Sequence, residues 1–254
     1  MLACDQVRGR VQCGEFNRNP KRQRGTNTTV VQPLADTSGD KTVALKCMSA
    51  LRTCTRLVLA TTNPHKLREL QSLLAPLGVP LLGLADIGRT ASEAIEDGAT
   101  LAANASLKAT HYARCLSEWV LSDDTGLEVD ALGGAPGVRS ARYAGDRVTM
   151  AENRSRLLAE LAGVDAGRRS ARFICCFALA DPGGQIVLEA RGKCAGRIRS
   201  EPAGSAGFGY DVLFEVEGIG RTLAELDPDE TALLGHRGDA ARHFIEAWRQ
   251  ATAT

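Results

Sequence analysis

The stretch ARFICCFALADPGGQIVLEARGKCAGRI, at 171–198, constrains the fold more strongly than any other part of this chain. Two long runs of mainly apolar residues flank a Pro-Gly-Gly turn signal, a pattern that predicts an antiparallel hairpin of two strands. Helical patterns occur on both sides of this hairpin. Helices mixed with hairpin strands argue for an α/β or α+β domain and against a helix bundle or a β-sandwich.

The remaining strands and helices are predicted from periodicity and capping residues. Apolar runs predict three further strands, at 56–61, 79–84 and 119–124, of which the last ends in Asp123 and Asp124. Amphipathic patterns predict helices at 63–78, 98–116, 153–164 and 238–250. The first of these helices is the best marked, because Asn63 can cap it, Pro64 suits its first position and Gly78 follows its end.

The N-terminal segment differs in composition from the rest of the chain. Residues 1–53 contain nine Lys and Arg against four Asp and Glu, a net charge of +5, whereas the whole chain carries +1. We predict that residues 1–53 are an extension, either disordered or not part of the fold, and that residues 54–250 form the domain. A nucleic-acid-binding arm and a targeting segment are the alternatives for this extension, and nucleic acid is not an expected partner.

Composition also bears on the compartment and on metal sites. No apolar run has the length of a membrane span, and the N-terminus lacks the apolar core of a secretory signal. Eight cysteines without a CxxC pair, together with only four histidines, argue against a structural zinc site. A reducing, cytoplasmic compartment with free thiols is the expectation.

Lys66 stands in the opening turn of the helix predicted at 63–78. A cation there opposes the helix dipole at a cost of about 0.3–1 kcal/mol. A bound anion would reverse that effect, because free backbone N–H groups and the lysine would converge on it. The alternative is a lysine whose ammonium group stays in water. The segment lacks the glycines and spacing of a P-loop.

Asp123 and Asp124 are adjacent at the end of a predicted strand, and Thr125 and Gly126 follow as a turn. Neighbouring side chains of a strand point to opposite sides, so one carboxylate can face a cleft while the other accepts local backbone hydrogen bonds. Beside a phosphate site, such a carboxylate could hold Mg²⁺ or take a proton from water. The alternative is an Asx-type turn without chemistry.

Two further stretches carry candidate binding residues. In EPAGSAGFGYDVLF, at 201–214, an aromatic face beside Asp211 could stack a purine and accept a hydrogen bond from its ring, although an ordinary loop fits as well. His236 and Arg237 stand just ahead of the last predicted helix. Arginine suits the recognition of keto or phosphate oxygens, and the alternative is a surface pair.

Five blocks in this order resemble the inosine triphosphate pyrophosphatase family, the Ham1-like dITP/XTP pyrophosphatases: LATTNPHKLREL, TLAANASLKA, LSDDTGLEVDALGGAPGVRSARYAG, EPAGSAGFGYDVLF and GHRG. The similarity extends from about residue 56 to residue 249. It implies an elongated, two-lobed α/β fold with a mixed sheet, flanking helices and an active site in the cleft between the lobes. It also implies Mg²⁺, a homodimer, and hydrolysis of inosine, deoxyinosine and xanthosine triphosphates to the monophosphate and pyrophosphate.

The resemblance assigns roles to residues at matching positions. Asp124 would be the proton acceptor and a metal ligand, and Thr125 a neighbouring substrate contact. The other substrate-binding residues would fall into a triphosphate segment, a base pocket and a closing pair: Thr61, Thr62, Asn63, Pro64, His65 and Lys66; Phe208, Gly209, Tyr210 and Asp211; His236 and Arg237.

Four positions depart from the family pattern. Ala103 replaces a glutamate that would serve the metal, and Thr231 replaces a lysine that would contact the substrate; Thr62 and Gly235 replace a glycine and a serine. Asp123, Glu96, Asp97 or a water could take over the role of the glutamate. An active pyrophosphohydrolase is therefore the main hypothesis, and a nucleotide-binding protein with weak or lost catalysis is the alternative.

Overall fold

The computed structural model describes residues 51–89 and 91–253. The predicted extension therefore lies outside the described residues, apart from positions 51–53. Within those three positions, Leu51 is buried and packs in the hydrophobic core with Leu57 and Leu59. The packed domain thus includes at least one residue before the expected start at position 54.

A six-stranded mixed sheet forms the centre of the molecule, with the strand order β2-β1-β3-β4-β5-β6. Its strands are β1 (Leu57–Leu59), β2 (Leu81–Gly83), β3 (Val120–Val129), β4 (Ser170–Ala180), β5 (Ile186–Ile198) and β6 (Phe214–Val216). β1 is parallel to β2 and β3, whereas β3, β4, β5 and β6 pair in antiparallel fashion. The predicted α/β class and the hairpin are confirmed, with β4 and β5 as the two strands of the hairpin.

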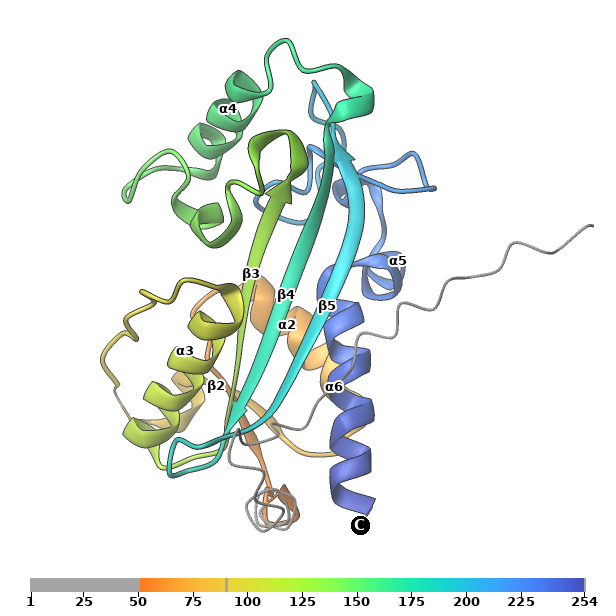
Figure 1. Ribbon diagram of the computed structural model, residues 1–254. Helices are drawn as coiled ribbons and strands as arrows, with labels where there is room; N and C mark the ends of the chain where they lie inside the picture. The colour runs from red at the N-terminus through yellow and green to blue at the C-terminus, as the bar shows by residue number, and fades with distance from the viewer. Residues whose placement is uncertain (1–50, 90, 254) are drawn as a thin grey trace, which may run out of the picture.

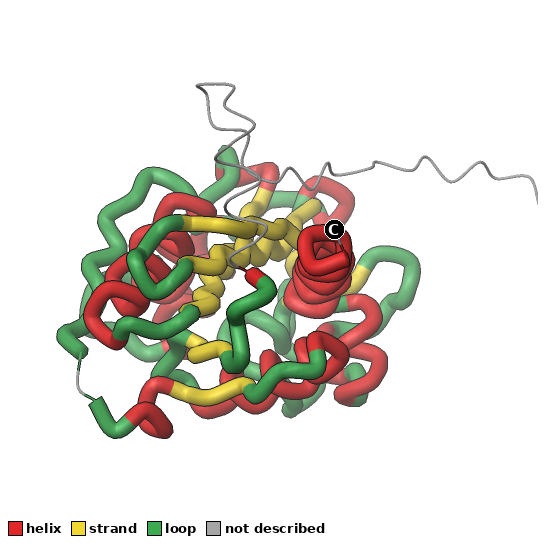
Figure 2. Tube along the Cα trace, turned by 90° about the horizontal axis from the view of Figure 1, so that it is seen from below, coloured by secondary structure: helices red, strands yellow, loops and turns green. Residues whose placement is uncertain are grey.

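Helices cover both faces of this sheet. The α-helices are α2 (Pro64–Leu74), α3 (Leu101–Leu116), α4 (Met150–Glu160), α5 (Pro228–Leu234) and α6 (His236–Ala253). Short 3₁₀ helices are η1 (Ala75–Leu77), η2 (Leu84–Ile87), η3 (Asp130–Leu132), η4 (Gly137–Arg142), η5 (Ala166–Arg168) and η6 (Leu223–Glu225). α2 and α6 lie on one face and α3 on the other, with α4 near the upper end of the strands (Figure 1). The view along the strands shows the sheet between these helical layers (Figure 2).

Three hydrophobic clusters divide the molecule into two lobes. In the lower lobe of Figure 1, one cluster joins the sheet to α2 and α6 and contains Leu121, Phe177 and Phe244, and a second joins the opposite face to α3. The third cluster lies in the upper lobe, around α4 and η6, and includes Leu157 and Phe173. Because β3, β4 and β5 extend through both lobes, they connect them rigidly and give the molecule its elongated shape.

The predicted end of the strand at Asp124 is wrong. β3 continues to Val129, so both aspartates lie in the middle of a ten-residue strand. Gly126 was interpreted as a turn residue, but a side chain there would collide with the carbonyl of Gly137 in η4. This glycine therefore allows another backbone to approach the strand closely, a common reason for glycine inside strands.

Several helix boundaries also differ from prediction. α4 begins at Met150 because Thr149 and Glu152 form a capping box just before the amphipathic segment. α6 begins at His236, so the His236–Arg237 pair belongs to its first turn instead of preceding it. No helix in the described part of the chain is long and apolar enough to cross a membrane.

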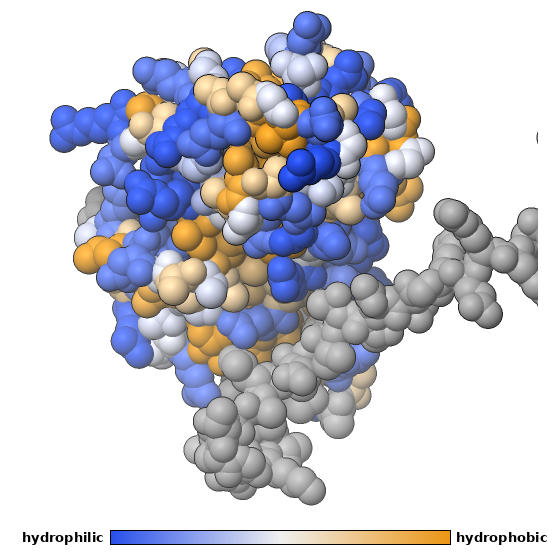
Figure 3. All heavy atoms as spheres, turned by 45° about the horizontal axis from the view of Figure 1, so that its top comes forward, coloured by the Kyte–Doolittle hydropathy of each residue, from blue (hydrophilic) through white to orange (hydrophobic). Residues whose placement is uncertain are grey.

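The face of the molecule drawn in Figure 3 is mostly polar. In the space-filling view, apolar residues are scattered among hydrophilic ones and form no single broad patch (Figure 3). Ile95, Leu107, Ile219 and Leu233 are the large hydrophobic side chains that are exposed among the described residues.

Candidate active site

A cavity of about 860 Å³ lies between the two lobes and brings together nearly all of the predicted site residues. The predicted residues that line it are Thr61, Thr62, Asn63, Lys66, Asp124, Thr125, Phe208, Gly209, Tyr210, Asp211, His236 and Arg237. His65 lines a second cavity of about 380 Å³, and Pro64 lines neither. Phe208, Asp211, His236 and Arg237 line both cavities, so the two spaces adjoin at these residues.

The N-terminus of α2 forms one edge of the first cavity. The Oδ1 atom of Asn63 accepts hydrogen bonds from the backbone N–H groups of His65 (2.9 Å) and Lys66 (3.3 Å). The predicted capping role of Asn63 is therefore confirmed, and Pro64 occupies the first turn as expected. Because the cap already occupies this oxygen, only the amide nitrogen of Asn63 is left to make the predicted substrate contact.

Asp123 is buried on the face of the sheet that packs against α2 and α6. Its Oδ2 atom lies 2.9 Å from Lys66 Nζ and 3.6 Å from Arg237 Nε. Burial alone would raise the pKa of Asp123, but Lys66, Arg237 and Lys108 outweigh burial and hold that pKa well below its usual range. The expectation that one carboxylate accepts local backbone hydrogen bonds is wrong, because side-chain cations from distant elements hold this one.

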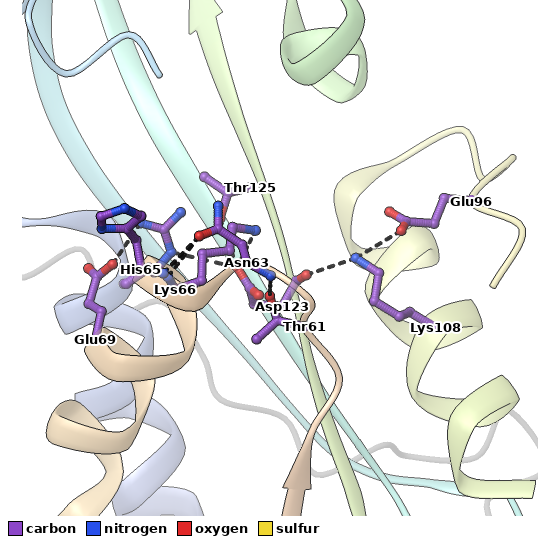
Figure 4. A network of polar contacts seen from close by, with 10 residues as sticks. Thr61, Asn63, His65, Lys66, Glu69, Glu96, Lys108, Asp123 and Thr125 are labelled. Carbon is purple, nitrogen blue, oxygen red and sulfur yellow. Dashed lines mark hydrogen bonds and ion pairs between the residues drawn. The ribbon is translucent and has the colours of Figure 1, made fainter. Parts of the chain in front are cut away.

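Arg237 extends this charge network. Its Nη1 atom lies 3.1 Å from Glu69 Oε2 on α2, and its guanidinium stacks on the ring of Phe208 at 4.9 Å. Arg237 is buried, so pairing with two carboxylates offsets much of its desolvation. Figure 4 shows Glu69, Lys66 and Asp123 of this network.

Asp124 lies on the opposite face of the sheet and has a different environment. Burial raises the pKa of Asp124 to about 6; Lys108 opposes this shift, and the negative charge of Glu96 adds to it. The Oδ2 atom of Asp124 is buried and has no hydrogen-bond partner among the described residues. An ionised carboxylate with a buried free oxygen is unfavourable unless another group binds there.

Two charged residues near Asp124 were missed or underrated from the sequence. Lys108 Nζ lies 3.1 Å from Glu96 Oε1 and donates a hydrogen bond to the backbone carbonyl of Asp123 at 3.2 Å (Figure 4). Lys108 was not predicted, and Glu96 was one of several possible substitutes for Ala103. The Gly98 N–H donates a hydrogen bond to Asn104 Oδ1 at 2.8 Å, and Asn104 is buried four residues before Lys108 on α3. Residues four apart lie on the same face of a helix, and this spacing is the feature of the sequence that indicates Lys108 as a residue of the site.

The donor set beside the cavity suits a hard cation. Asp124 and Glu96 are among the carboxylates that line the cavity, together with Glu93, Asp123 and Asp211, and Asp124 has a free buried oxygen. Residues 51–89 and 91–253 contain no cluster of three His, Cys, Asp or Glu residues that could hold a metal ion alone. Mg²⁺ commonly binds through one or two carboxylates plus substrate phosphates, so these residues fit it. Ala103 does not line the cavity.

The loop between β5 and β6 forms the other end of the cavity. The Phe208 N–H donates to Asp211 Oδ2 at 2.8 Å, and burial raises the pKa of Asp211 to about 6. The Tyr210 hydroxyl donates to the carbonyl of Ser140 at 2.9 Å, which makes Tyr210 a structural anchor. Phe208 and Asp211 are thus the side chains of this loop that remain available to a ligand.

His236 is a buried, neutral imidazole at the junction of the two cavities. Its ring stacks on Phe173 with centroids 4.6 Å apart, and neither ring nitrogen has a hydrogen-bond partner among the described residues. Burial and the nearby cations Arg237 and Lys66 hold the pKa of His236 well below its usual value. Two unsatisfied nitrogens at a cavity wall indicate a site for a polar ligand.

Known proteins are similar to this chain over most of its length. A dITP/XTP pyrophosphatase of Rhodopirellula baltica is 47% identical over 189 residues, which cover 74% of this chain and 90% of that protein. One from Geobacillus kaustophilus is 45% identical over 195 residues, covering 76% and 94%.

Solved structures also match. A HAM1 protein from Coxiella burnetii superimposes with a TM-score of 0.69 and 38% identity, over 77% of this chain and 98% of that one. A nucleoside-triphosphatase / dITP/XTP pyrophosphatase from Mycobacterium abscessus has a TM-score of 0.60 and 40% identity, over 74% and 97%. The model of the Ham1 family matches residues 57–247, and this chain is therefore a member of the Ham1 family.

Proposed function

We propose that this protein hydrolyses non-standard purine nucleoside triphosphates, namely ITP, dITP and XTP, to the monophosphate and pyrophosphate. The observation that carries the proposal is the buried Oδ2 atom of Asp124, which has no hydrogen-bond partner among the described residues. Asp124 lines the same cavity as Asn63 and Lys66 at the start of α2. The relatives named dITP/XTP pyrophosphatase support the substrate class.

Mg²⁺ is the proposed cofactor, with Asp124 and Glu96 as its protein ligands. When bound, the ion would offset the negative charge of the triphosphate and of the transition state. Lys108 pairs with Glu96 and lines the same cavity, so its ammonium group would add positive charge beside the phosphates.

Asp124 is the proposed proton acceptor. Its carboxylate would orient a water and take a proton from it as the water attacks the α-phosphorus, so that pyrophosphate leaves. General-base assistance of this kind is typically worth about 10²–10⁴-fold in rate. Asp123 has a positioning role in this scheme, because it holds Lys66 and Arg237 in place on the other side of the strand.

The triphosphate would lie along Thr61, Thr62, Asn63 and Lys66 at the start of α2, where Pro64 and His65 form the first turn of the helix. Lys66 is paired with Asp123 and would share its charge with a phosphate. The expected free backbone N–H groups are not present at the start of α2, because Asn63 Oδ1 accepts from His65 and Lys66 and Pro64 has no N–H. The positive end of the helix dipole and the Lys66 ammonium group are what favour an anion at this position. Thr125, also at the cavity, would contact the substrate beside Asp124.

The base would lie among Phe208, Asp211, His236 and Arg237, where the two cavities adjoin. A neutral His236 can donate to or accept from a 6-keto purine, and Phe208 offers a ring face. A pocket that satisfies its buried polar groups with a keto edge leaves them unpaired when adenine binds, and such pockets discriminate strongly.

Weak or lost catalysis is the less favoured alternative. It is based on Ala103 and Thr231. Ala103 lies outside the wall of the larger cavity, whereas Glu96 lies within it, and Thr231 lines the second cavity. We further propose a homodimer, a cytoplasmic location and a catalytic domain at 54–250 that also includes Leu51.

Pyrophosphate release from dITP, XTP, ITP and dATP, measured while Mg²⁺ is titrated, tests the proposal. We expect Mg²⁺-dependent release from the first three and at least tenfold slower release from dATP. No release from dITP or XTP, or equal rates with dATP, would refute the proposed function.

A further inference from the structure

The loop at 204–211 carries the two side chains that face the proposed base site, yet its backbone has little intrinsic rigidity. Gly204, Gly207 and Gly209 all adopt left-handed conformations, with φ of 79°, 70° and 68°. Glycines of this kind have access to many other conformations. Contacts from other elements must therefore select the one conformation that presents Phe208 and Asp211 to the cavity.

Two adjacent residues of this loop are bound to the upper lobe. Arg154 Nη1, on α4, donates to the carbonyl of Gly209 at 2.8 Å, and the Tyr210 hydroxyl donates to the carbonyl of Ser140 at 2.9 Å. The first bond fixes the orientation of the peptide between Gly209 and Tyr210. Because Phe208 and Asp211 flank this peptide and are themselves hydrogen-bonded to each other, its orientation is transmitted to both.

Arg154 is dedicated to this contact. No carboxylate pairs with Arg154 anywhere in the described part of the chain, whereas Arg156, two residues further along α4, pairs with Glu160 and donates to the carbonyl of Tyr143. Arg154 is half-buried, and a hydrogen bond from a charged donor in such a place is stronger than a neutral one.

We propose that Arg154 is a positioning residue that holds the base-recognition loop through the carbonyl of Gly209 and thereby sets the selectivity for the purine base. The inference rests on the proposed function, because it assigns the loop to the base. Arg154 does not line the cavity, so it acts through the loop and not by touching the substrate.

The loss of Arg154 should affect the binding of the two ends of the substrate differently. The triphosphate end, at α2 and Asp124, has no contact with Arg154, so kcat at saturation should change less than about twofold. The base end loses a charge-assisted hydrogen bond to its loop, so the KM for dITP should rise roughly tenfold, and preference over dATP should fall.

The test compares Arg154→Ala, Arg154→Lys and the control Arg156→Ala, which removes a guanidinium from the same helix without touching the loop. We expect faster amide hydrogen exchange at 206–214 in Arg154→Ala, a higher KM for dITP and partial rescue of both by lysine. Inhibition by inorganic triphosphate, which lacks a base, should not change. Arg156→Ala should lower the melting temperature and leave the exchange at 206–214 and the KM unchanged.

Unchanged exchange at 206–214 in Arg154→Ala, or an equal effect of Arg156→Ala on the KM, would overturn the inference. The exchange measurement needs no substrate, so it decides the role of Arg154 in the loop even if the wild-type protein releases no pyrophosphate from dITP. In that case the proposed function fails, and the selectivity part of the inference fails with it.

Discussion

Asp123 and Asp124 are neighbours on β3, yet their carboxylates face opposite sides of the sheet and their pKa values shift in opposite directions. Asp123 is surrounded by Lys66 and Arg237 and stays ionised. Asp124 has a buried oxygen without a partner and lies near the negative charge of Glu96. One carboxylate is therefore used to hold cations of the protein, and the other remains available for a ligand.

Asp124→Asn should lower the activity without lowering the stability of the fold. Removing a buried charge that has a free oxygen should leave the melting temperature unchanged or raise it, while kcat should fall by at least about 100-fold. Thermal melts and a pyrophosphate assay check this, with Asp146→Asn, an exposed position, as the control. A variant that keeps a tenth or more of wild-type activity would exclude Asp124 as the proton acceptor.

Asp123→Asn should destabilise the fold. The substitution leaves Lys66 and Arg237 without their shared buried anion, and breaking a buried ion pair in this way costs about 3–5 kcal/mol. Urea denaturation measures the loss. Glu118→Gln, which breaks the surface pair with Arg56, is the matched control and should leave the free energy of unfolding nearly unchanged.

Glu96→Gln and Ala103→Glu should have unequal effects on metal binding. If Glu96 is the second ligand, Glu96→Gln weakens Mn²⁺ binding roughly tenfold or more, followed by electron paramagnetic resonance with Mn²⁺ in place of Mg²⁺. Ala103→Glu should change the affinity less than threefold, because position 103 is off the cavity wall. A large gain in affinity with Ala103→Glu would instead indicate an incomplete site.

His236 should make the protein less stable in acid. Its pKa in the fold lies well below the value near 6.5 of an unfolded chain, so the unfolded state binds more protons. The contribution of His236 to the free energy of unfolding should therefore fall as the pH drops below about 6.5, by up to about 1.4 kcal/mol per pH unit. Asp124 and Asp211, whose pKa values are raised to about 6, contribute in the opposite direction over the same range. The groups around the ring are Phe173 of β4, Lys66 of α2, Arg237 of α6 and Asp123 of β3.

Urea denaturation between pH 7.5 and 5 measures this slope. Relative to the wild type, His236→Gln should become more stable as the pH falls, because glutamine takes up no proton, whereas replacing the exposed His65 by glutamine should leave the slope unchanged. An unchanged slope in His236→Gln would show that another group controls the pH dependence.

Gly192→Ala should disturb the site from a distance. A methyl group on Gly192 of β5 would overlap the backbone of His236 and Ala240 in the first turns of α6. The helix must then move away from the sheet, at a cost of about 1–3 kcal/mol or more, and His236 and Arg237 move with it. Both the melting temperature and kcat/KM should drop. Gly167→Ala, which meets no atom within 4 Å, should be nearly neutral.

The sequence by itself determined the class of fold, the hairpin of β4 and β5 and the capped start of α2. These features depend on local signals: an apolar run, a Pro-Gly-Gly turn, or Asn63 followed by Pro64. Ordered motifs also indicated the family and most of the residues around the cavity. Local signals failed at Gly126, where the chain has a glycine for the sake of a distant backbone and not for a turn.

The resemblance pointed to Asp124 as the proton acceptor, but only the tertiary structure decided what surrounds each of the two aspartates. Alternation along a strand is local, and it requires Asp123 and Asp124 to face opposite sides. What covers each side is set by elements far away in the chain, namely α2 and α6 on one face and α3 with the segment of Glu96 on the other. The pKa of a carboxylate depends on burial and on neighbouring charges, and both arise here from contacts between residues distant in sequence. The sequence therefore placed the pair, and the packing of the helices made the two carboxylates different.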